Sequence, residues 1–190
     1  MPAAVSAILV EGVSDQLALA ALAERRDRDL DAEAVSIVPM GGVTNIGHYL
    51  DILGPHGLGL EVAGLCDEGE VHIVQRGLAR SGLAGGPSLD EMRSLGFFMC
   101  VTDLEDELIR ALGVAAVERV LEEHGDLTSF RNFQQMPAQR ERPDDARLRR
   151  FMGTRSGRKA RYAPLLVQAL DLDRIPAPLD DLLTHVGSGH

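Results

Sequence analysis

The sequence predicts an α/β fold: a mostly parallel, four-stranded sheet flanked by helices, with a helical appendage at its C-terminal end. Four short apolar runs of the kind that form buried strands alternate with segments of helical periodicity. This alternation is typical of βαβ units, whose right-handed crossovers give parallel strands. Acidic residues follow three of the four runs, and the carboxyl ends of parallel strands meet at one edge of a sheet.

The first half of the predicted sheet is defined by two apolar runs. Residues 7–10 form the first strand, and the apolar residues within 17–22 form the stripe of the helix that follows. Residues 35–38 form the second strand. A Pro-Met-Gly-Gly turn at 39–42 then leads to a helix over 44–53.

The second half repeats this order with a longer connection. The third strand, at residues 61–66, precedes a helix or irregular crossover over 71–80. Residues 81–88 are rich in Gly, Pro and Ser and are predicted to be an exposed loop. The fourth strand, at 97–101, leads into one long amphipathic helix over 103–123.

Beyond residue 125 the periodicity weakens. Residues 126–145 show little pattern, and short helices are predicted at 148–152, 161–170 and 179–186. We therefore divide the chain into an α/β core, residues 1–125, and a basic helical appendage, residues 126–190, that packs on this core.

Composition limits the compartment and the cofactor class. The chain has 190 residues, 45% of them apolar, which is enough to bury an ordinary core. No apolar stretch is long enough to span a membrane and no signal peptide precedes the first strand, so we expect a cytoplasmic protein without a membrane partner. The cysteines, Cys66 and Cys100, end predicted strands, which indicates buried thiols and argues against a disulfide or a zinc site.

The charge is segregated along the chain. The formal net charge is −10, yet residues 140–161 carry nine of the 19 Lys and Arg and three of the 29 acids. A basic face of this kind binds phosphate backbones, so we expect nucleic acid, with DNA favoured over RNA, as the partner. Four arginines of this segment are the predicted contacts: Arg149, Arg150, Arg155 and Arg158. A solvated, Arg-rich helix remains the alternative.

Carboxylates follow the first and third predicted strands. Glu11 lies directly after the first strand, in a tight turn, and Asp15 lies at the start of the next helix. Asp67, Glu68 and Glu70 follow the third strand. A carboxylate just beyond a buried strand gains nothing from packing, whereas such groups are good ligands for hard cations.

The fourth strand completes the acidic set with Asp103 and Glu105. Mg²⁺ or Mn²⁺ suits these oxygen ligands, and two ions about 4 Å apart can stabilise the attacking and leaving oxygens of a displacement at phosphorus. Either Glu11 or a hydroxide held by an ion would act as the base. We assign Glu11, Asp15 and Glu105 to one ion and Asp67 and Glu70 to the other, with Asp103 as a further ligand at the same edge.

Each of these residues also has a structural explanation. Thr102 and Glu105 have the spacing of a capping box, and Asp15 could serve the dipole of its helix. Gly41 and Gly42 provide either backbone freedom in a strand-to-helix turn or close approach to a phosphate. Glu11 and Asp67 are the hardest to explain structurally.

These motifs resemble the Toprim domain, and in particular that of the OLD-family (overcoming lysogenization defect) nucleases. The resemblance rests on Glu11 in LVEGVSD, Gly41 or Gly42 in PMGGVTN, Asp67 in GLCDEGE, LEDEL at 104–108 and GRKARYA at 157–163. It implies a Toprim-like (Rossmann-like) fold and a nuclease dependent on Mg²⁺ or Mn²⁺. The family's Asp-x-Asp motif is incomplete here, because position 69 is Gly, and Glu70 or Glu68 could supply the missing oxygen.

The resemblance also implies catalytic roles for Glu11 and Lys159. Lys159 is the one lysine among 19 basic residues, which favours a need for its compact ammonium group, although chance retention of an exposed lysine is the alternative. It would neutralise charge on the transition state.

OLD nucleases normally carry an ATPase domain, but the sequence lacks a Gly-x-x-x-x-Gly-Lys-[Ser/Thr] run. We therefore expect a free-standing Toprim protein, with an ATPase or specificity partner and a homodimer both left open. A non-catalytic protein that binds nucleic acid, nucleotide or a protein partner is the alternative function.

Overall fold

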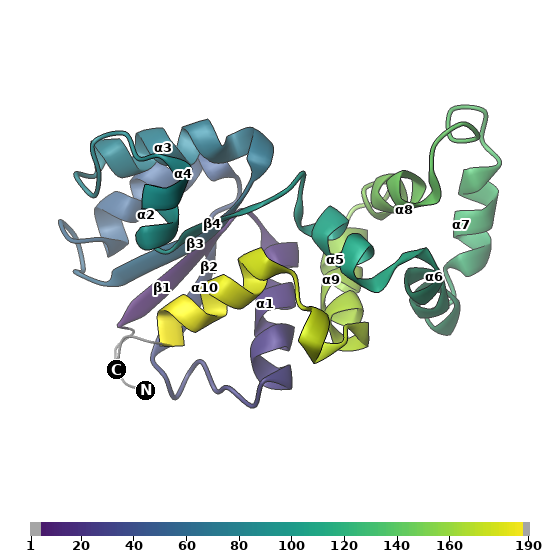
Figure 1. Cartoon of the computed structure of the whole chain (residues 1–190), viewed down its shortest axis with the longest axis horizontal. Helices are drawn as coiled ribbons and strands as arrows, with labels where there is room; N and C mark the ends of the chain where they lie inside the picture. The colour runs from purple at the N-terminus through teal and green to yellow at the C-terminus, as the bar shows by residue number, and fades with distance from the viewer. Residues whose placement is uncertain (1–4, 188–190) are drawn as a thin grey trace.

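The computed structural model describes residues 5–187 and contains, within this range, one four-stranded parallel sheet of order β2-β1-β3-β4 (Figure 1). The strands are β1 Ser6–Val10, β2 Val35–Pro39, β3 Glu61–Asp67 and β4 Phe97–Cys100. The predicted fold class is confirmed. β1 is central and fully buried, and its Ile8 is paired with Ile37 on one side and Ala63 on the other. Because all strands are parallel, the residues that follow them lie at one edge.

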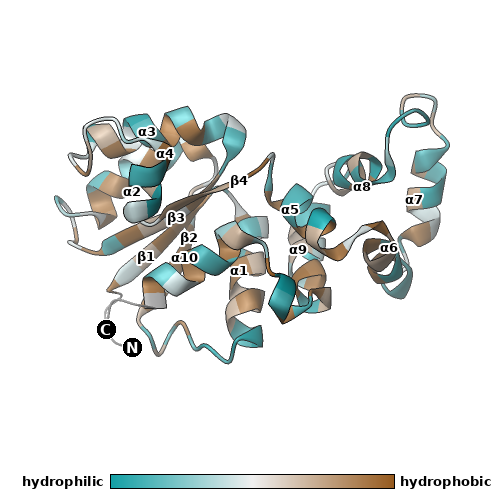
Figure 2. Cartoon of the chain, in the orientation of Figure 1, coloured by the Kyte–Doolittle hydropathy of each residue, from teal (hydrophilic) through white to brown (hydrophobic). Residues whose placement is uncertain are grey.

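Helices cover both faces of the sheet (Figure 1). One face carries α1 (Val13–Arg25) and α10 (Ala177–Gly187), and the other carries α2 (Ile46–Leu53), α3 (Val71–Arg80) and α4 (Leu89–Ser94). The strands between these layers are predominantly hydrophobic (Figure 2), so the sheet divides the core into two apolar clusters. Both cysteines are free and buried, as expected, and burial raises the pKa of Cys66 to about 12.

One helix prediction after β4 was wrong, and one helix was not predicted. The segment expected to form one long helix is divided into α5 (Leu104–Leu112) and α6 (Val114–Glu123). Gly113 separates them at φ +77°. Glycine adopts this conformation readily, whereas an L side chain rarely does. The segment read as lacking periodicity contains α7 (Leu127–Gln134), which buries Phe130 and Phe133.

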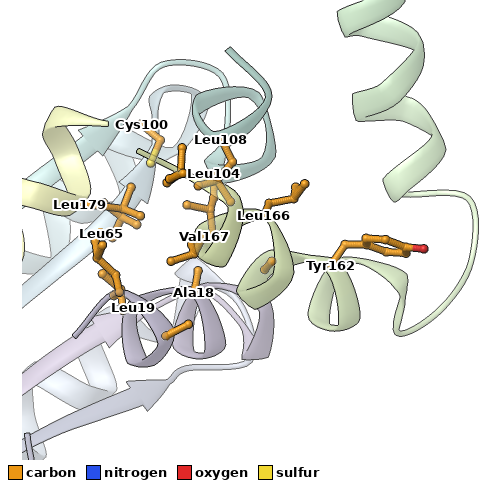
Figure 3. Packing of buried hydrophobic residues seen from close by; sticks show 14 of the residues in the cluster. Ala18, Leu19, Leu65, Cys100, Leu104, Leu108, Tyr162, Leu166, Val167 and Leu179 are labelled. Carbon is orange, nitrogen blue, oxygen red and sulfur yellow. The ribbon is translucent and has the colours of Figure 1, made fainter. Parts of the chain in front are cut away.

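The helices beyond residue 125 share the larger apolar cluster with the sheet. These helices are α7, α8 (Asp144–Met152), α9 (Arg158–Ala169) and α10. Figure 3 shows Leu166 and Val167 of α9 packed close to Ala18 of α1, with Tyr162 buried further along the helix. Arg25 donates hydrogen bonds of 2.7 Å to the carbonyls of Val167 and Leu170. The division of the chain at residue 125 stays a prediction.

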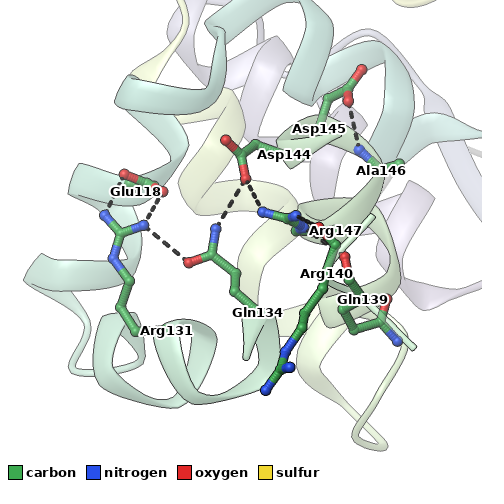
Figure 4. Close-up of polar contacts among 9 residues, drawn as sticks. All are labelled: Glu118, Arg131, Gln134, Gln139, Arg140, Asp144, Asp145, Ala146 and Arg147. Atoms are coloured by element: carbon green, nitrogen blue, oxygen red, sulfur yellow. Dashed lines mark hydrogen bonds and ion pairs between the residues drawn. The ribbon is translucent and has the colours of Figure 1, made fainter. Parts of the chain in front are cut away.

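A polar network fixes α6, α7 and α8 relative to one another (Figure 4). Arg131 of α7 forms a bidentate ion pair with Glu118 of α6, with both N–O distances at 2.8 Å. Gln134 links Arg131 to Asp144, which also pairs with Arg147. α8 also packs beside α5, next to the acidic edge of the sheet. Among the described helices, none is long and apolar enough to cross a membrane.

Candidate metal centre

The carboxyl edge of the sheet gathers most of the predicted acids around one cavity of about 280 Å³. Eleven residues line it: Glu11, Gly12, Ser14, Asp15, Gly41, Gly42, Asp67, Asp103, Leu104, Glu105 and Lys159. Glu11 directly follows β1 and Asp67 ends β3, whereas α5 and α9 supply Glu105 and Lys159. Ser14 was missed in the sequence, because a serine in the first turn of a helix carries no distinctive signal.

Three carboxylates form the tightest cluster. One oxygen each from Glu11, Asp67 and Glu70 lie within 4.8 Å of one another. Glu11 follows β1 and Asp67 ends β3, and the 3₁₀ turn η2 (Glu68–Glu70) brings Glu70 back toward both. Glu68 is exposed and lies outside this cluster. We call Glu11, Asp67 and Glu70 the acidic triad.

The grouping differs from the predicted assignment of ligands. Glu11 was expected to share an ion with Asp15 and Glu105, but the cluster in which it lies is formed with Asp67 and Glu70. The glycine at position 69 has open space around it, and Glu70, one position later, provides a third carboxylate.

Burial and, after it, the crowding of negative charges raise the pKa values of acids at this edge. Burial, reinforced by the charges of Asp103, Asp15, Glu11 and Glu70, raises the pKa of Asp67 to about 7. Burial and the charge of Glu11 raise the pKa of Glu70 as well. A divalent cation would remove this penalty by neutralising the triad.

Two buried oxygens also fit a cation. Glu70 Oε2 and Glu105 Oε1 are buried and have no hydrogen-bond partner in the described structure. Buried polar atoms are nearly always satisfied, so unpartnered carboxylate oxygens beside an acidic triad fit the ligand preference of Mg²⁺ or Mn²⁺.

Asp15 lies in the first turn of α1 and also lines the cavity. Its Oδ2 accepts a hydrogen bond of 2.9 Å from the Gly12 amide and so caps α1. Burial, opposed by this hydrogen bond and reinforced by Glu105 and Glu11, raises the pKa of Asp15 to about 6. Asp15 therefore lines the cavity with one oxygen engaged in the cap.

Asp103 and Glu105 are paired with cations. Lys159 Nζ lies 2.7 Å from Glu105 Oε2, and Arg149 Nε and Nη2 each lie 2.7 Å from Asp103 Oδ2. The other oxygen of Asp103 accepts the Asp106 amide at 2.9 Å, which makes Asp103 the N-cap of α5. The capping box suggested for Thr102 and Glu105 is therefore wrong, and Glu105 is free of that role.

The backbone before α5 is unusual. Thr102 has φ +71°, a left-handed conformation that is a genuine outlier for a β-branched residue. It lies in the bend between β4 and Asp103. Such strained residues concentrate at functional sites.

The two turn glycines lie where expected. Gly41 and Gly42 line the cavity with φ of +70° and +124°, so the turn needs glycine for its backbone conformation. The Gly42 amide donates a hydrogen bond of 3.0 Å to the Glu11 carbonyl, so this turn is bonded to the backbone of a triad residue.

The basic residues are divided by the fold. Arg149, Arg150 and Lys159 line a recess of about 390 Å³, together with Phe133, Gly153, Thr154 and Asp103. Phe133 and Thr154 were not predicted, because only the packing of α7 and α8 brings them there. Arg155 is exposed and lies outside the recess.

Arg158 corrects one of the predicted nucleic-acid contacts. It is 5% exposed, its guanidinium stacks 3.9 Å from the centre of the Phe151 ring, and it donates to the Phe151 carbonyl at 2.9 Å. A buried arginine with these intramolecular partners is a structural residue that cannot reach a nucleic acid.

Comparison with known proteins supports the resemblance. A family model described as "Overcoming lysogenization defect protein-like, TOPRIM domain" matches residues 4–68. The solved C-terminal region of the Xanthomonas campestris pv. campestris OLD protein is 26% identical, with a TM-score of 0.74 over 96% of this chain and 92% of that one. The corresponding region of the Burkholderia pseudomallei OLD protein is 23% identical, with a TM-score of 0.71 over 96% and 97%.

No curated protein sequence matches the chain. The family match covers β1 to β3, and therefore the segment that holds Glu11, Asp15 and Asp67. The structural matches extend over the helices that follow. Residues 4–68 therefore match the OLD-like Toprim model, and nearly the whole length of the chain has the fold of the C-terminal region of OLD proteins.

Proposed function

We propose that this protein is a divalent-metal-dependent phosphodiester hydrolase that acts on nucleic acid, with Mg²⁺ or Mn²⁺ held by the acidic triad. The observation that carries the proposal is the convergence of Glu11, Asp67 and Glu70 within 4.8 Å at the carboxyl edge of a parallel sheet. Open α/β sheets bind their ligands at this edge.

The residues around the triad fit the chemistry of a phosphodiester. A bound Mg²⁺ or Mn²⁺ would polarise the phosphoryl group and lower the energy of charge that develops on its oxygens. Glu105 offers its unpartnered Oε1 as a further oxygen ligand. Lys159 lines the same cavity, and its ammonium group can neutralise charge on the phosphate.

Nucleic acid is the proposed substrate because cations adjoin the acidic cavity. The recess that contains Arg149 and Arg150 shares Asp103 and Lys159 with that cavity. A phosphate backbone could therefore contact basic side chains on one side of the cleaved bond. The preference for DNA over RNA, an ATPase or specificity partner, and a homodimer remain expectations from the sequence.

A non-catalytic binding protein is the second candidate. Two observations favour it: Gly69 replaces an acid of the family motif, and Asp103 and Glu105 are already paired with Arg149 and Lys159. Such a protein would bind one metal, or none, and would release no product.

A cleavage assay separates the two candidates. We expect purified protein with Mn²⁺ to cleave single-stranded DNA, double-stranded DNA, supercoiled DNA or RNA. Asp67→Asn and Lys159→Ala should each lower the rate at least about a hundredfold, because each removes several kcal/mol of charge stabilisation. Glu68→Gln is the matched control, since Glu68 is an exposed acid next to Asp67 that lies outside the triad.

The outcomes are distinct. Loss of cleavage in Asp67→Asn with retention in Glu68→Gln supports a metal-dependent hydrolase. Wild-type protein that leaves all four substrates intact in both Mg²⁺ and Mn²⁺ overturns cleavage by the protein alone and favours the binding candidate.

A further inference from the structure

The recess beside the acidic cavity is a separate concave site. It has a volume of about 390 Å³ and is formed by α7, α8 and the start of α9. Asp103 and Lys159 belong to the linings of both cavities, so their side chains form the boundary between them.

The charge of this recess is opposite to that of its neighbour. Its lining contains three cationic side chains, Arg149, Arg150 and Lys159, and a single carboxylate, Asp103. This positive concentration is found in a chain with a formal net charge of −10. Two of these cations, Arg149 and Lys159, are each paired with one carboxylate. Arg150 adds a positive charge without an acidic partner among the described residues, and this charge would attract an anion into the recess.

Arg149 is oriented by the structure. Its Nε and Nη2 both contact Asp103 Oδ2, whose carboxylate is itself fixed by the N-cap bond to the Asp106 amide. The remaining nitrogen, Nη1, has no hydrogen-bond partner among the described residues. Asp103 therefore holds one side of the guanidinium and leaves the other side available to a ligand.

Arg150 has no internal partner. Its side chain is exposed and makes no hydrogen bond or ion pair within the described part of the chain, in contrast to the neighbouring Arg147 and Arg158. Thr154 and the buried Phe133 also line the recess.

We propose that this recess is a phosphate-binding subsite, which holds a phosphate of the substrate next to the phosphate at the acidic triad. The proposal rests on the proposed function, because it assigns the second phosphate to the same bound molecule. Arginine suits this role, since its planar guanidinium matches phosphate oxygens in a bidentate geometry. Asp103 is accordingly a positioning residue for Arg149.

Phosphate binding can be measured without catalysis. The fluorescence anisotropy of a labelled oligothymidylate measures its binding, in EDTA at low salt. Inorganic phosphate is added as the competing ligand. We expect Arg150→Ala to weaken oligothymidylate binding roughly tenfold, the usual effect of one lost charge-assisted hydrogen bond. The slope of log Kd against log salt should fall by about 0.7, as for one lost phosphate contact on a single strand.

Two further variants test the geometry. Arg149→Lys keeps the charge but loses the planar fork, so its affinity should fall between those of wild type and Arg150→Ala. Arg80→Ala removes the same charge from an exposed position of α3, outside the recess, and should leave affinity unchanged. Arg150 is exposed, so its replacement should leave the melting temperature unchanged, which separates binding from folding.

The outcomes decide the proposal and its ligand. Competition by inorganic phosphate, together with loss in Arg150→Ala but not in Arg80→Ala, supports the subsite. Wild-type protein that does not bind oligothymidylate overturns it. Equal losses in Arg150→Ala and Arg80→Ala, or no loss in either, overturn it. Because EDTA removes metal, this result is independent of whether Mn²⁺ supports cleavage.

Discussion

The acids at the carboxyl edge of the sheet form two groups that differ in how their charge is balanced. Glu11, Asp67 and Glu70 come from strand ends and the turn after β3, and no cation lies within ion-pair distance of them in the described structure. Asp103 and Glu105 begin α5 and are each paired with a cation, Arg149 from α8 and Lys159 from α9.

The difference indicates where a divalent ion would bind first. Charge in the triad can be balanced only by protons or an added cation. The charges of Asp103 and Glu105, which we call the paired group, are already neutralised. A divalent cation at the triad would remove the repulsion among its carboxylates, but a cation at Asp103 must displace Arg149. The two groups therefore predict different responses to the same substitution.

The largest expected effect is on metal-dependent stability. Mn²⁺ at about one hundred times its Kd should stabilise the wild-type protein by about 2.7 kcal/mol, or about 5–10 °C in Tm. Glu11→Gln should lose most of this gain, because it removes a triad ligand. Asp103→Asn should keep it, since Asn preserves the N-cap of α5 and the triad is intact. Equal losses in both variants would contradict the distinction between the triad and the acids that are paired with cations.

The second effect concerns the paired group. Lys159→Ala leaves the buried carboxylate of Glu105 without its cation, so we expect a loss of about 2 kcal/mol in unfolding free energy at pH 8 in EDTA. Burial opposes the charged state of Lys159, but the hydrogen bond and charge of Glu105 outweigh it and raise the pKa of this ammonium.

A double-mutant cycle checks this interpretation. In the Glu105→Gln background, Lys159→Ala should cost much less, because no buried charge remains. An unchanged cost would show that Lys159 contributes through packing. Mn²⁺ should also stabilise Lys159→Ala more than wild type, since both oxygens of Glu105 become available.

A smaller effect is expected from pH. The pKa of Asp67 is about 7 in the folded protein and lies near 3.8 without the fold, so the native state binds more protons between these values. Stability in EDTA should therefore fall as pH rises from about 4 to about 7. Because Asp67 is partly exposed, we expect this fall in stability to be about 1 kcal/mol, or 2–4 °C in Tm.

Asp67→Asn should flatten this pH dependence, whereas Asp103→Asn should reduce it only slightly. The stabilisation by Mn²⁺ should grow over the same pH range, because protons compete with the ion. A Tm in EDTA that rises from pH 4 to pH 7 in the wild type would contradict the assigned direction.

The smallest effect is predicted for the strained residue before the paired group. Thr102→Gly should raise stability by about 0.5–1 kcal/mol, because glycine adopts φ +71° without the steric cost of a β-branched side chain. Gly113→Ala is the opposite test at φ +77° and should lower stability by about 1 kcal/mol. Thermal denaturation of both variants provides the measurement, and a loss in Thr102→Gly would show that its side chain offsets the strain.

The strands could be predicted because their signal is local. An apolar run bounded by turn residues identifies β1 and β3 without knowledge of the rest of the chain. The same signal failed after β4. A single glycine within an amphipathic pattern did not reveal the break at Gly113, and the polar sequence of α7 concealed a helix stabilised by the burial of Phe130 and Phe133.

The site could be predicted only in part, for the same reason. The sequence by itself determined that Glu11, Asp67 and Asp103 lie at one edge, because parallel strands bring their carboxyl ends together. Only the tertiary structure decided which acids are paired, since Arg149 and Lys159 lie 46 and 54 residues from their carboxylates along the chain. It also decided that Arg158 is buried while Arg150 is exposed. Charge is a property of composition, but its neutralisation depends on distances of a few ångströms between separate elements.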